Sequence, residues 1–285
     1  MEPILRPATR SDAGPAGVIC YAAFKAIAEQ HAFPPDLPAP EAGVGLVNEL
    51  LAREDVYGVI AETGGRVVGS NFLWEDESVA GVGPITVDPA VQNRRVGRKL
   101  MDAVLERARD RDIAAVRLVQ AAYHARSLSL YTRLGFDARE PLSVMQGPAL
   151  GLHIAGHSVR GATAADLQAA DALYRRVHGH ARGVELRAAL RKESVRVVER
   201  DRRLTGYTTG IGFFGHAVGE TTADLQALIG AAPAFGGPGF LAPTRNAELM
   251  RWCLEHGLRI VQPMTLMTRG PYQEPKGAFL PSVLY

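Results

Sequence analysis

The sequence predicts a mixed α/β protein made of two similarly built halves, and three features carry this prediction. Short β-branched runs alternate with amphipathic segments of helical period. The opening segment Leu5-Arg-Pro-Ala-Thr-Arg-Ser-Asp12 has a counterpart in Val159-Arg-Gly-Ala-Thr-Ala-Ala-Asp166. A helix-glycine-apolar step occurs at Gly135-Phe136 and again at Gly257-Leu258. The repeated landmarks indicate that one fold has been duplicated.

Length and composition agree with two globular domains. The chain has 285 residues, which we divide into domains at 1–150 and 151–285. It is 47% hydrophobic and 22% charged with a net charge of +2, so we expect no nucleic-acid partner. We expect no membrane partner and a cytoplasmic protein, because neither a signal segment nor a membrane-spanning run is present. Cys20 and Cys253 lack metal-ligand spacing, so we expect neither zinc nor a disulfide framework.

Local patterns define the elements of the first half. Thr9 or Ser11 is placed to cap the first helix, after a short opening strand. Thr63-Gly-Gly65 between two β-branched runs is a hairpin signal. The helix expected over 96–111 has its apolar residues on one face. The other expected helices run to about residue 30, near 41–53 and over 125–134, and the strands cover 56–62, 66–74, 79–87, 115–120, a stretch from 136, and 143–146.

The second half repeats this order in shorter form. Its helices are expected over 167–177 and 247–256, and its strands over 195–199 and 204–214. Arg6 and Gly135 are 129 positions apart, whereas their counterparts Arg160 and Gly257 are 97 apart. No Val-Asp-Pro and no basic loop follow the second strand pair, so we place the shortening there.

The segment from Ile85 to Leu100 predicts an anion site. A β-branched run ends in Asp88-Pro89, a short polar loop follows, and Gly97 opens an amphipathic helix. A helix N-terminus after a strand and a loop presents unpaired amides and the positive end of the helix dipole to a phosphate. Four cations, Arg94, Arg95, Arg98 and Lys99, crowd this turn, although they also suit a solvated helix face. Walker and dinucleotide-binding glycine patterns are both absent, which disfavours a nucleotide binder.

Two motifs then make the first half resemble the Gcn5-related N-acetyltransferase (GNAT) superfamily. The family's Gln/Arg-x-x-Gly-x-Gly/Ala reads here Gln92-Asn-Arg-Arg-Val-Gly97, with Arg95 in place of the first glycine. That position must therefore admit a Cβ, and a positive φ there would weaken binding. The second motif reads Ser127-Leu-Ser-Leu-Tyr131-Thr-Arg-Leu-Gly135-Phe136. The resemblance covers residues 3–147, and the second half looks like a degenerate copy. It implies two tandem GNAT-like domains, each a twisted, mostly antiparallel sheet flanked by helices.

The resemblance implies acetyl-CoA as co-substrate and no metal. The CoA pyrophosphate would lie on the loop amides, and pantetheine would pair with the strand before them. A neighbouring strand would splay away near residues 119–121 and leave room for the thioester. The implied CoA-binding residues are Ile85, Thr86, Val87, Gln92, Asn93, Arg94, Arg95, Val96, Gly97, Arg98 and Ser127.

The implied reaction moves an acetyl group to a primary amine by direct attack on the thioester. Because a free alkylamine has a pKa of about 10, a base must remove its proton. The resemblance gives Tyr131 the role of general acid and Val87 that of oxyanion donor. The base candidates are Glu75, Glu77 and His124, although a solvated turn and a helix cap explain them equally well. The acceptor is an amine on a small molecule or a peptide.

Other interpretations stay open. The chain is alternatively a non-catalytic acyl-CoA-binding sensor or scaffold, which would not need Tyr131. In the second half Cys253 occupies the place of Tyr131, so we expect a structural domain that closes the acceptor cleft or forms a homodimer surface. The apolar C-terminal segment is either packed on the protein or places Tyr285 in the acceptor site.

Overall fold

The computed structural model describes residues 2–76, 78–92 and 95–284. Its elements agree with the sequence prediction in most of the first half, whereas in the second half the segments 183–191, 217–219, 222–230, 240–243, 259–269 and 278–280 form helices and strands that were not predicted. The first half contains β1 (Ile4–Pro7), α1 (Ala13–Gln30), α2 (Pro40–Leu51), β2 (Val56–Thr63), β3 (Arg66–Trp74), β4 (Val79–Val82), β5 (Thr86–Val87), α3 (Val96–Asp110), β6 (Ala115–Ala121), α4 (Ala125–Arg133) and β7 (Asp137–Gln146). The second half contains β8 (Ser158–Gly161), α5 (Leu167–His178), α6 (Gly183–Arg191), β9 (Arg196–Arg200), β10 (Arg203–Thr208), β11 (Ala217–Gly219), α7 (Thr222–Gly230), β12 (Phe240–Pro243), α8 (Ala247–Glu255), β13 (Arg259–Arg269) and β14 (Ala278–Leu280). Short 3₁₀ turns occupy Arg10–Asp12, Pro89–Val91 and Ala164–Asp166.

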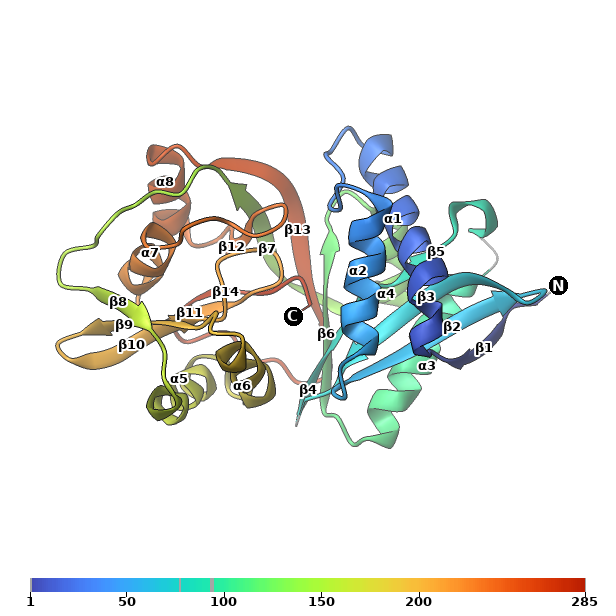
Figure 1. The fold of residues 1–285 in the computed structure, drawn as a ribbon, viewed down its shortest axis with the longest axis horizontal. Helices are drawn as coiled ribbons and strands as arrows, with labels where there is room; N and C mark the ends of the chain where they lie inside the picture. Colours follow the sequence, from blue (N-terminus) through green and yellow to red (C-terminus); the bar gives the residue numbers. More distant parts are fainter. Residues whose placement is uncertain (1, 77, 93–94, 285) are drawn as a thin grey trace.

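Two sheets organise these elements. A nine-stranded sheet has the order β1-β2-β3-β4-β6-β13-β7-β12, with β5 paired to β3, and a five-stranded sheet has the order β14-β11-β10-β9-β8. The pairings are antiparallel apart from that of β4 with β6. Helices flank both sheets (Figure 1). The predicted fold, two mostly antiparallel halves flanked by helices, is confirmed.

The two halves exchange strands. β13, from the second half, lies between β6 and β7, while β7 lies between β13 and β12 (Figure 1). Both exchanged strands follow the repeated helix-glycine step, and Gly135 and Gly257 have φ of 85° and 81°. A left-handed residue ends a helix, and glycine adopts it without a Cβ penalty. The division at residue 150 stays a prediction, but the sheet crosses it.

The repeated opening motif is a repeated ion-pair network. Arg6 donates to Asp12 at 2.7 and 2.8 Å and to Glu62 at 2.5 and 3.0 Å. Arg160 makes the same contacts with Asp166, at 2.8 Å, and with Glu199, at 2.5 and 3.0 Å. In each copy the arginine links the aspartate at the end of the short 3₁₀ turn to a glutamate of the adjacent strand. The repeated sequence motif therefore forms the same ion-pair network in both halves.

Two predicted strands are shorter than expected. The strand expected over 79–87 divides into β4 and β5, because Gly83 has φ of 143° and Pro84 cannot donate to a ladder. The strand expected over 204–214 ends at Thr208, before Gly210 at φ 146°. The segments expected from 136 and over 143–146 form one strand, β7.

The core of the first half confirms the helical period read from the sequence. Leu100, Met101, Val104, Leu105 and Ala108 of α3 are all buried against the sheet. The face of α3 that packs on the sheet fixes where its N-terminus lies. In the part of the chain that the structure describes, no helix combines the length and apolarity needed to cross a membrane.

Candidate active site

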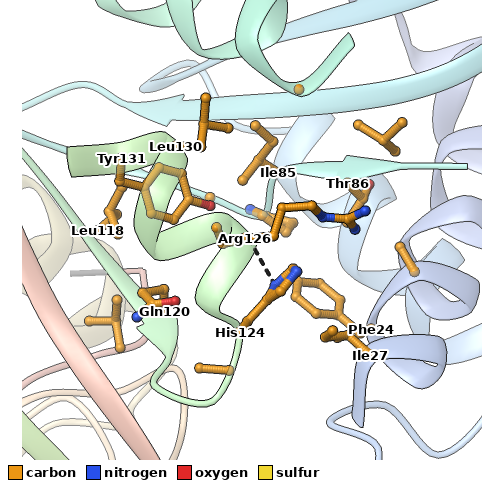
Figure 2. Close-up of a pocket in the computed structure, with 18 of the residues that line it drawn as sticks. Phe24, Ile27, Ile85, Thr86, Leu118, Gln120, His124, Arg126, Leu130 and Tyr131 are labelled. Carbon is orange, nitrogen blue, oxygen red and sulfur yellow. Dashed lines mark hydrogen bonds between the residues drawn. The ribbon is translucent and has the colours of Figure 1, made fainter. Parts of the chain in front are cut away.

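A cavity opens where two neighbouring strands diverge. β4 pairs with β6 from Val79↔Ala115 to Gly81↔Arg117. Further along, β5 pairs with β3, whereas β6 continues its pairing with β13. The strands separate where the resemblance predicts, and the cavity between them has a volume of about 880 Å³. Ile85 and Thr86 line one side, and Leu118 and Gln120 of β6 line the other (Figure 2).

The N-terminus of α3 faces this cavity without a capping side chain. Arg95 occupies the N-cap position and makes no side-chain cap. Gln92, Arg95, Val96, Gly97 and Arg98 line the cavity, together with Val87 of β5. Asn93 and Arg94 lie outside the described residues. The first-turn amides and the helix dipole are therefore directed toward an anion in the cavity.

Arg95 adopts the conformation for which glycine is usual. Its φ and ψ are 62° and 10°, in the left-handed region. A side chain there costs about 1 kcal/mol relative to glycine. The sequence predicts weaker binding if Arg95 has a positive φ, and the structure shows that it does. The strain lies in the loop itself and leaves the α3 amides in place.

Arginines gather at this end of the cavity. Arg95, Arg98, Arg126 and Arg133 all line it. The Arg126 Nη2 donates to the Gln92 Oε1 at 2.5 Å, which joins α4 to the loop. Lys99 is not a lining residue and pairs with Glu2 at 2.5 Å, as expected of a solvated face. Arg126 and Arg133 were not singled out from the sequence, because their helix brings them to the loop only in the folded chain.

Tyr131 is buried on α4, and its ring points into the cavity beside Leu118 (Figure 2). Burial raises the pKa of its phenol to about 12, an effect that a hydrogen bond from Ser127 opposes. The phenol is therefore protonated at neutral pH and has a proton to donate. Ser127 also lines the cavity, one helical turn before Tyr131.

His124 is also a cavity residue. Its Nδ1 lies 2.8 Å from the Ser127 Oγ, the contact dashed in Figure 2. Its Nε2 is buried and has no hydrogen-bond partner among the described residues. Burial, with smaller contributions from Arg126 and His31, lowers its pKa to about 4. The imidazole is therefore neutral and a weak base.

Of the acidic base candidates, Glu75 does not line the cavity. Glu75 pairs with Arg107 at 2.6 Å and with Arg111 at 3.6 Å, and it is not a lining residue. These ion pairs disfavour Glu75 as a base, because Arg107 and Arg111 bind its carboxylate, but its role stays a prediction. Glu77 lies outside the described residues.

One carboxylate that lines the cavity was not predicted from the sequence. Asp36 lies in the proline-rich loop between α1 and α2 and accepts a 2.7 Å hydrogen bond from the Gln262 Nε2 of β13. The Tyr123 hydroxyl donates to the Gln262 Oε1 at 3.2 Å, and Tyr123 stacks on Phe33 at 4.3 Å. Burial raises the pKa of Asp36. Since 226 positions separate Asp36 from Gln262, no local pattern could have joined them.

Gln120 is the second residue that the sequence did not reveal. It is 6% exposed on β6, and both of its amide atoms lack a hydrogen-bond partner within the described chain. Buried polar groups in proteins are nearly always paired. A ligand or water in the cavity is the partner that this amide needs.

The second half does not repeat the anion site. β11 runs almost directly into α7, and Asp224 accepts from the Thr221 amide and hydroxyl at 2.9 and 2.7 Å. The Asp224 carboxylate thus caps the N-terminus of α7, whereas the N-cap residue of α3 makes no side-chain cap. Cys253 is buried in the core, and burial raises its pKa to about 12, as expected of a structural thiol.

The C-terminal segment lies against the same cavity. β14 pairs with β11, and the Val283 amide donates to the Phe213 carbonyl at 2.8 Å. Val283 and Leu284 line the cavity with Phe213 and Phe214. Tyr285 lies outside the described residues. Within the described ranges no three His, Cys, Asp or Glu side chains are grouped so that they could hold a metal ion.

Comparison with known proteins gives a consistent result. Residues 24–136 match the model of the acetyltransferase (GNAT) family. The "IAA acetyltransferase" of Azospirillum brasilense is 29% identical over 109 residues, which are 37% of this chain and 71% of that protein.

Two solved structures match nearly the whole chain. A Pyrococcus horikoshii protein described as a candidate acetyltransferase has a TM-score of 0.73 and 17% identity, covering 98% of this chain and 94% of its own. A tandem GNAT protein from the clavulanic acid biosynthesis pathway has a TM-score of 0.55 and 16% identity, covering 95% and 100%. These likenesses concern the fold alone.

Proposed function

We propose that this chain is a GNAT acetyltransferase that transfers the acetyl group of acetyl-CoA to a primary amine, because residues 24–136 match the model of that family, whose members use acetyl-CoA. One observation carries the proposal: the uncapped N-terminus of α3 and the Tyr131 phenol face the same cavity. An anion site alone would suit any phosphate ligand, but a buried, protonated phenol beside it suits a leaving thiolate.

The CoA pyrophosphate binds the amides of Val96, Gly97 and Arg98 in this proposal. The surrounding arginines neutralise its charge. The pantetheine arm then lies along Ile85, Thr86 and Val87, and the thioester reaches the opening between β5 and β6. An ideal Cβ built on Gly97 would come no closer than 3.8 Å to its protein neighbours, so the space beside this residue is available to a ligand.

The reaction then needs one base and one acid. A base takes a proton from the ammonium, and the neutral nitrogen attacks the thioester carbonyl carbon. The C–N bond forms, and the carbonyl oxygen carries negative charge that the Val87 amide stabilises. The C–S bond then breaks with its electron pair going to sulfur, which takes the Tyr131 proton. The nitrogen loses its second proton to water, and water reprotonates the phenolate.

Only the first half carries these groups in our proposal. In the second half Asp224 occupies the helix N-terminus and Cys253 stands in the core. We therefore propose one active site per chain, with the second half in a supporting role.

The first experiment measures acetyl-CoA binding by calorimetry and thiol release with a panel of primary amines. In Tyr131→Phe we expect kcat to fall at least about tenfold while the Kd for acetyl-CoA stays unchanged. Tyr57→Phe is the control, because Tyr57 lies on β2 beside Arg107 and outside the cavity. Wild-type turnover by Tyr131→Phe across the pH range would remove this residue as the acid.

The rival function is a non-catalytic acyl-CoA-binding sensor or scaffold. Such a protein binds acetyl-CoA and its melting temperature rises with the ligand. It releases no thiol with any amine. Amine-dependent thiol release therefore separates the two functions.

A further inference from the structure

We propose that the acceptor is an apolar primary amine without a carboxylate group, and that Asp36, held by Gln262 of the second half, binds its ammonium and takes its proton. This inference rests on the proposed function and deepens it. It concerns the part of the cavity that is lined by Asp36, from the loop between α1 and α2.

The charges lining the cavity come from different elements. Asp36 is the sole carboxylate among the described residues that line it. The arginines Arg95, Arg98, Arg126 and Arg133 belong to α3, α4 and the loop before α3, where an anionic ligand is expected. A cavity lined by arginines near α3 and by one carboxylate from the loop between α1 and α2 suits two ligands of opposite charge, CoA phosphates and an ammonium.

Asp36 is oriented by a chain of hydrogen bonds. The Tyr123 hydroxyl donates to Gln262, which therefore presents its amide NH₂ to the Asp36 Oδ1. Gln262 is 1% exposed, so this arrangement is held by packing. In the described part of the chain Asp36 forms no ion pair, and its partial burial disfavours the charged form and raises its pKa. The ammonium of a bound acceptor would supply the missing charge.

Many of the other lining residues are apolar. Phe24, Ile27 and Leu37 come from α1 and the loop after it (Figure 2). Phe213, Phe214, Val283 and Leu284 come from the second half. These side chains suit an aryl or alkyl group. A carboxylate on the acceptor would meet both an apolar wall and the like charge of Asp36.

Asp36 is also suited to the proton transfer. Burial raises its pKa, which makes it a stronger base than an ordinary aspartate. The carboxylate takes one proton from the ammonium, leaving the lone pair on nitrogen for attack on the thioester. The proton passes to water after product release.

This role also explains what the second half does. β13 brings Gln262 into the first half's sheet, and the segment after β14 brings Val283 and Leu284 to the cavity. The acceptor end is therefore completed by residues of the degenerate copy. Of the two roles open to the second half, closing the acceptor cleft is the one that these contacts favour.

The test measures binding of 2-phenylethylamine to protein saturated with coenzyme A, which has no acetyl group to transfer. The comparison ligand is phenylalanine, the same amine with a carboxylate added. Asp36→Asn keeps an oxygen for the Gln262 hydrogen bond and removes the charge. The control is Glu29→Gln, because Glu29 pairs with Lys25 on α1 and does not line the cavity. Melting temperatures check that each variant folds.

We expect the wild type and Glu29→Gln to bind 2-phenylethylamine and to reject phenylalanine. Asp36→Asn should bind the amine at least about tenfold more weakly, with CoA affinity unchanged. With acetyl-CoA and the amine, its kcat should also fall. Equal amine affinity in Asp36→Asn, or equal affinity for phenylalanine, would overturn the inference.

The failure of the inference differs from that of the proposed function. If CoA binds to the wild type but 2-phenylethylamine does not, the acceptor assignment is wrong and the CoA site stands. If acetyl-CoA and CoA do not bind at all, the proposed function is wrong and the inference fails with it.

Discussion

Replacing Gly97 by alanine should stabilise the protein and weaken its binding of acetyl-CoA. Gly97 is the second residue of α3, and a Cβ added there meets only Leu130 Cδ2 and Val87 Cγ2, each at 3.8 Å. These are ordinary van der Waals contacts, so the protein accommodates the methyl group. Alanine is favoured over glycine in a helix by up to about 1 kcal/mol. We therefore expect the free energy of unfolding to stay unchanged or to rise by that amount.

The same methyl group should interfere with the binding of the ligand. It would project toward Val87 and Leu130, which line the cavity, where we propose that the loop amides bind the CoA pyrophosphate. Displacing a phosphate oxygen from one amide loses a hydrogen bond to a charged group, worth about 1.5–3 kcal/mol. The Kd for acetyl-CoA should then rise by about 10- to 100-fold.

Calorimetric titration and urea unfolding measure the two effects separately. Gly45→Ala is the matched control, since Gly45 is a glycine of α2 at which an added Cβ would meet no atom within 4 Å. It should gain the same stability and leave the Kd unchanged. Equal Kd values in the two variants would show that the pyrophosphate does not lie against Gly97. A less stable Gly97→Ala protein would refute the packing argument.

Three further outcomes are expected. Arg95→Gly should raise the free energy of unfolding by up to about 1 kcal/mol in urea titrations, because it relieves the positive φ of 62°, and an unchanged or lower value would contradict this strain. The Arg6 guanidinium lowers the pKa of Asp12 to about 2, so Asp12 contributes about 2 kcal/mol of stability above pH 4 that is lost as the pH falls to 2. Asp12→Asn should lack this acid dependence in urea unfolding, and parallel pH profiles would argue against the network. Removing residues 283–285 should weaken amine binding and leave CoA affinity intact, since Val283 and Leu284 line the acceptor end, and equal amine affinity would exclude that contact.

Several features could be predicted because they depend on short stretches of chain. The apolar period of α3 follows from five residues within nine positions, and all five are buried. The glycine after each helix, Gly135 and Gly257, has the left-handed conformation that such a residue provides. The uncapped loop before α3 and Tyr131 on α4 were likewise identified from motifs.

Other features depended on which segments pack together. Glu75 belongs to an acidic turn that the sequence leaves without a partner, but α3 and the residue after it place Arg107 and Arg111 beside it. The proline-rich loop contained no motif, yet it carries the carboxylate that lines the cavity. The sequence could not show that Glu75 is paired with arginines whereas Asp36 lines the cavity, because the residues that contact each of them come from distant elements.

The sequence by itself thus determined most elements of the first half and placed the loop before α3 and Tyr131 in recognisable motifs, since helical period, glycine at a helix end and a strand-loop-helix junction act within a few residues. Only the tertiary structure decided that β13 lies between β6 and β7 and brings Gln262 to Asp36. Strand order and register are properties of the whole sheet, set by how all the apolar faces are buried together. The acceptor end of the site therefore belongs to both halves, although each half alone shows no trace of it.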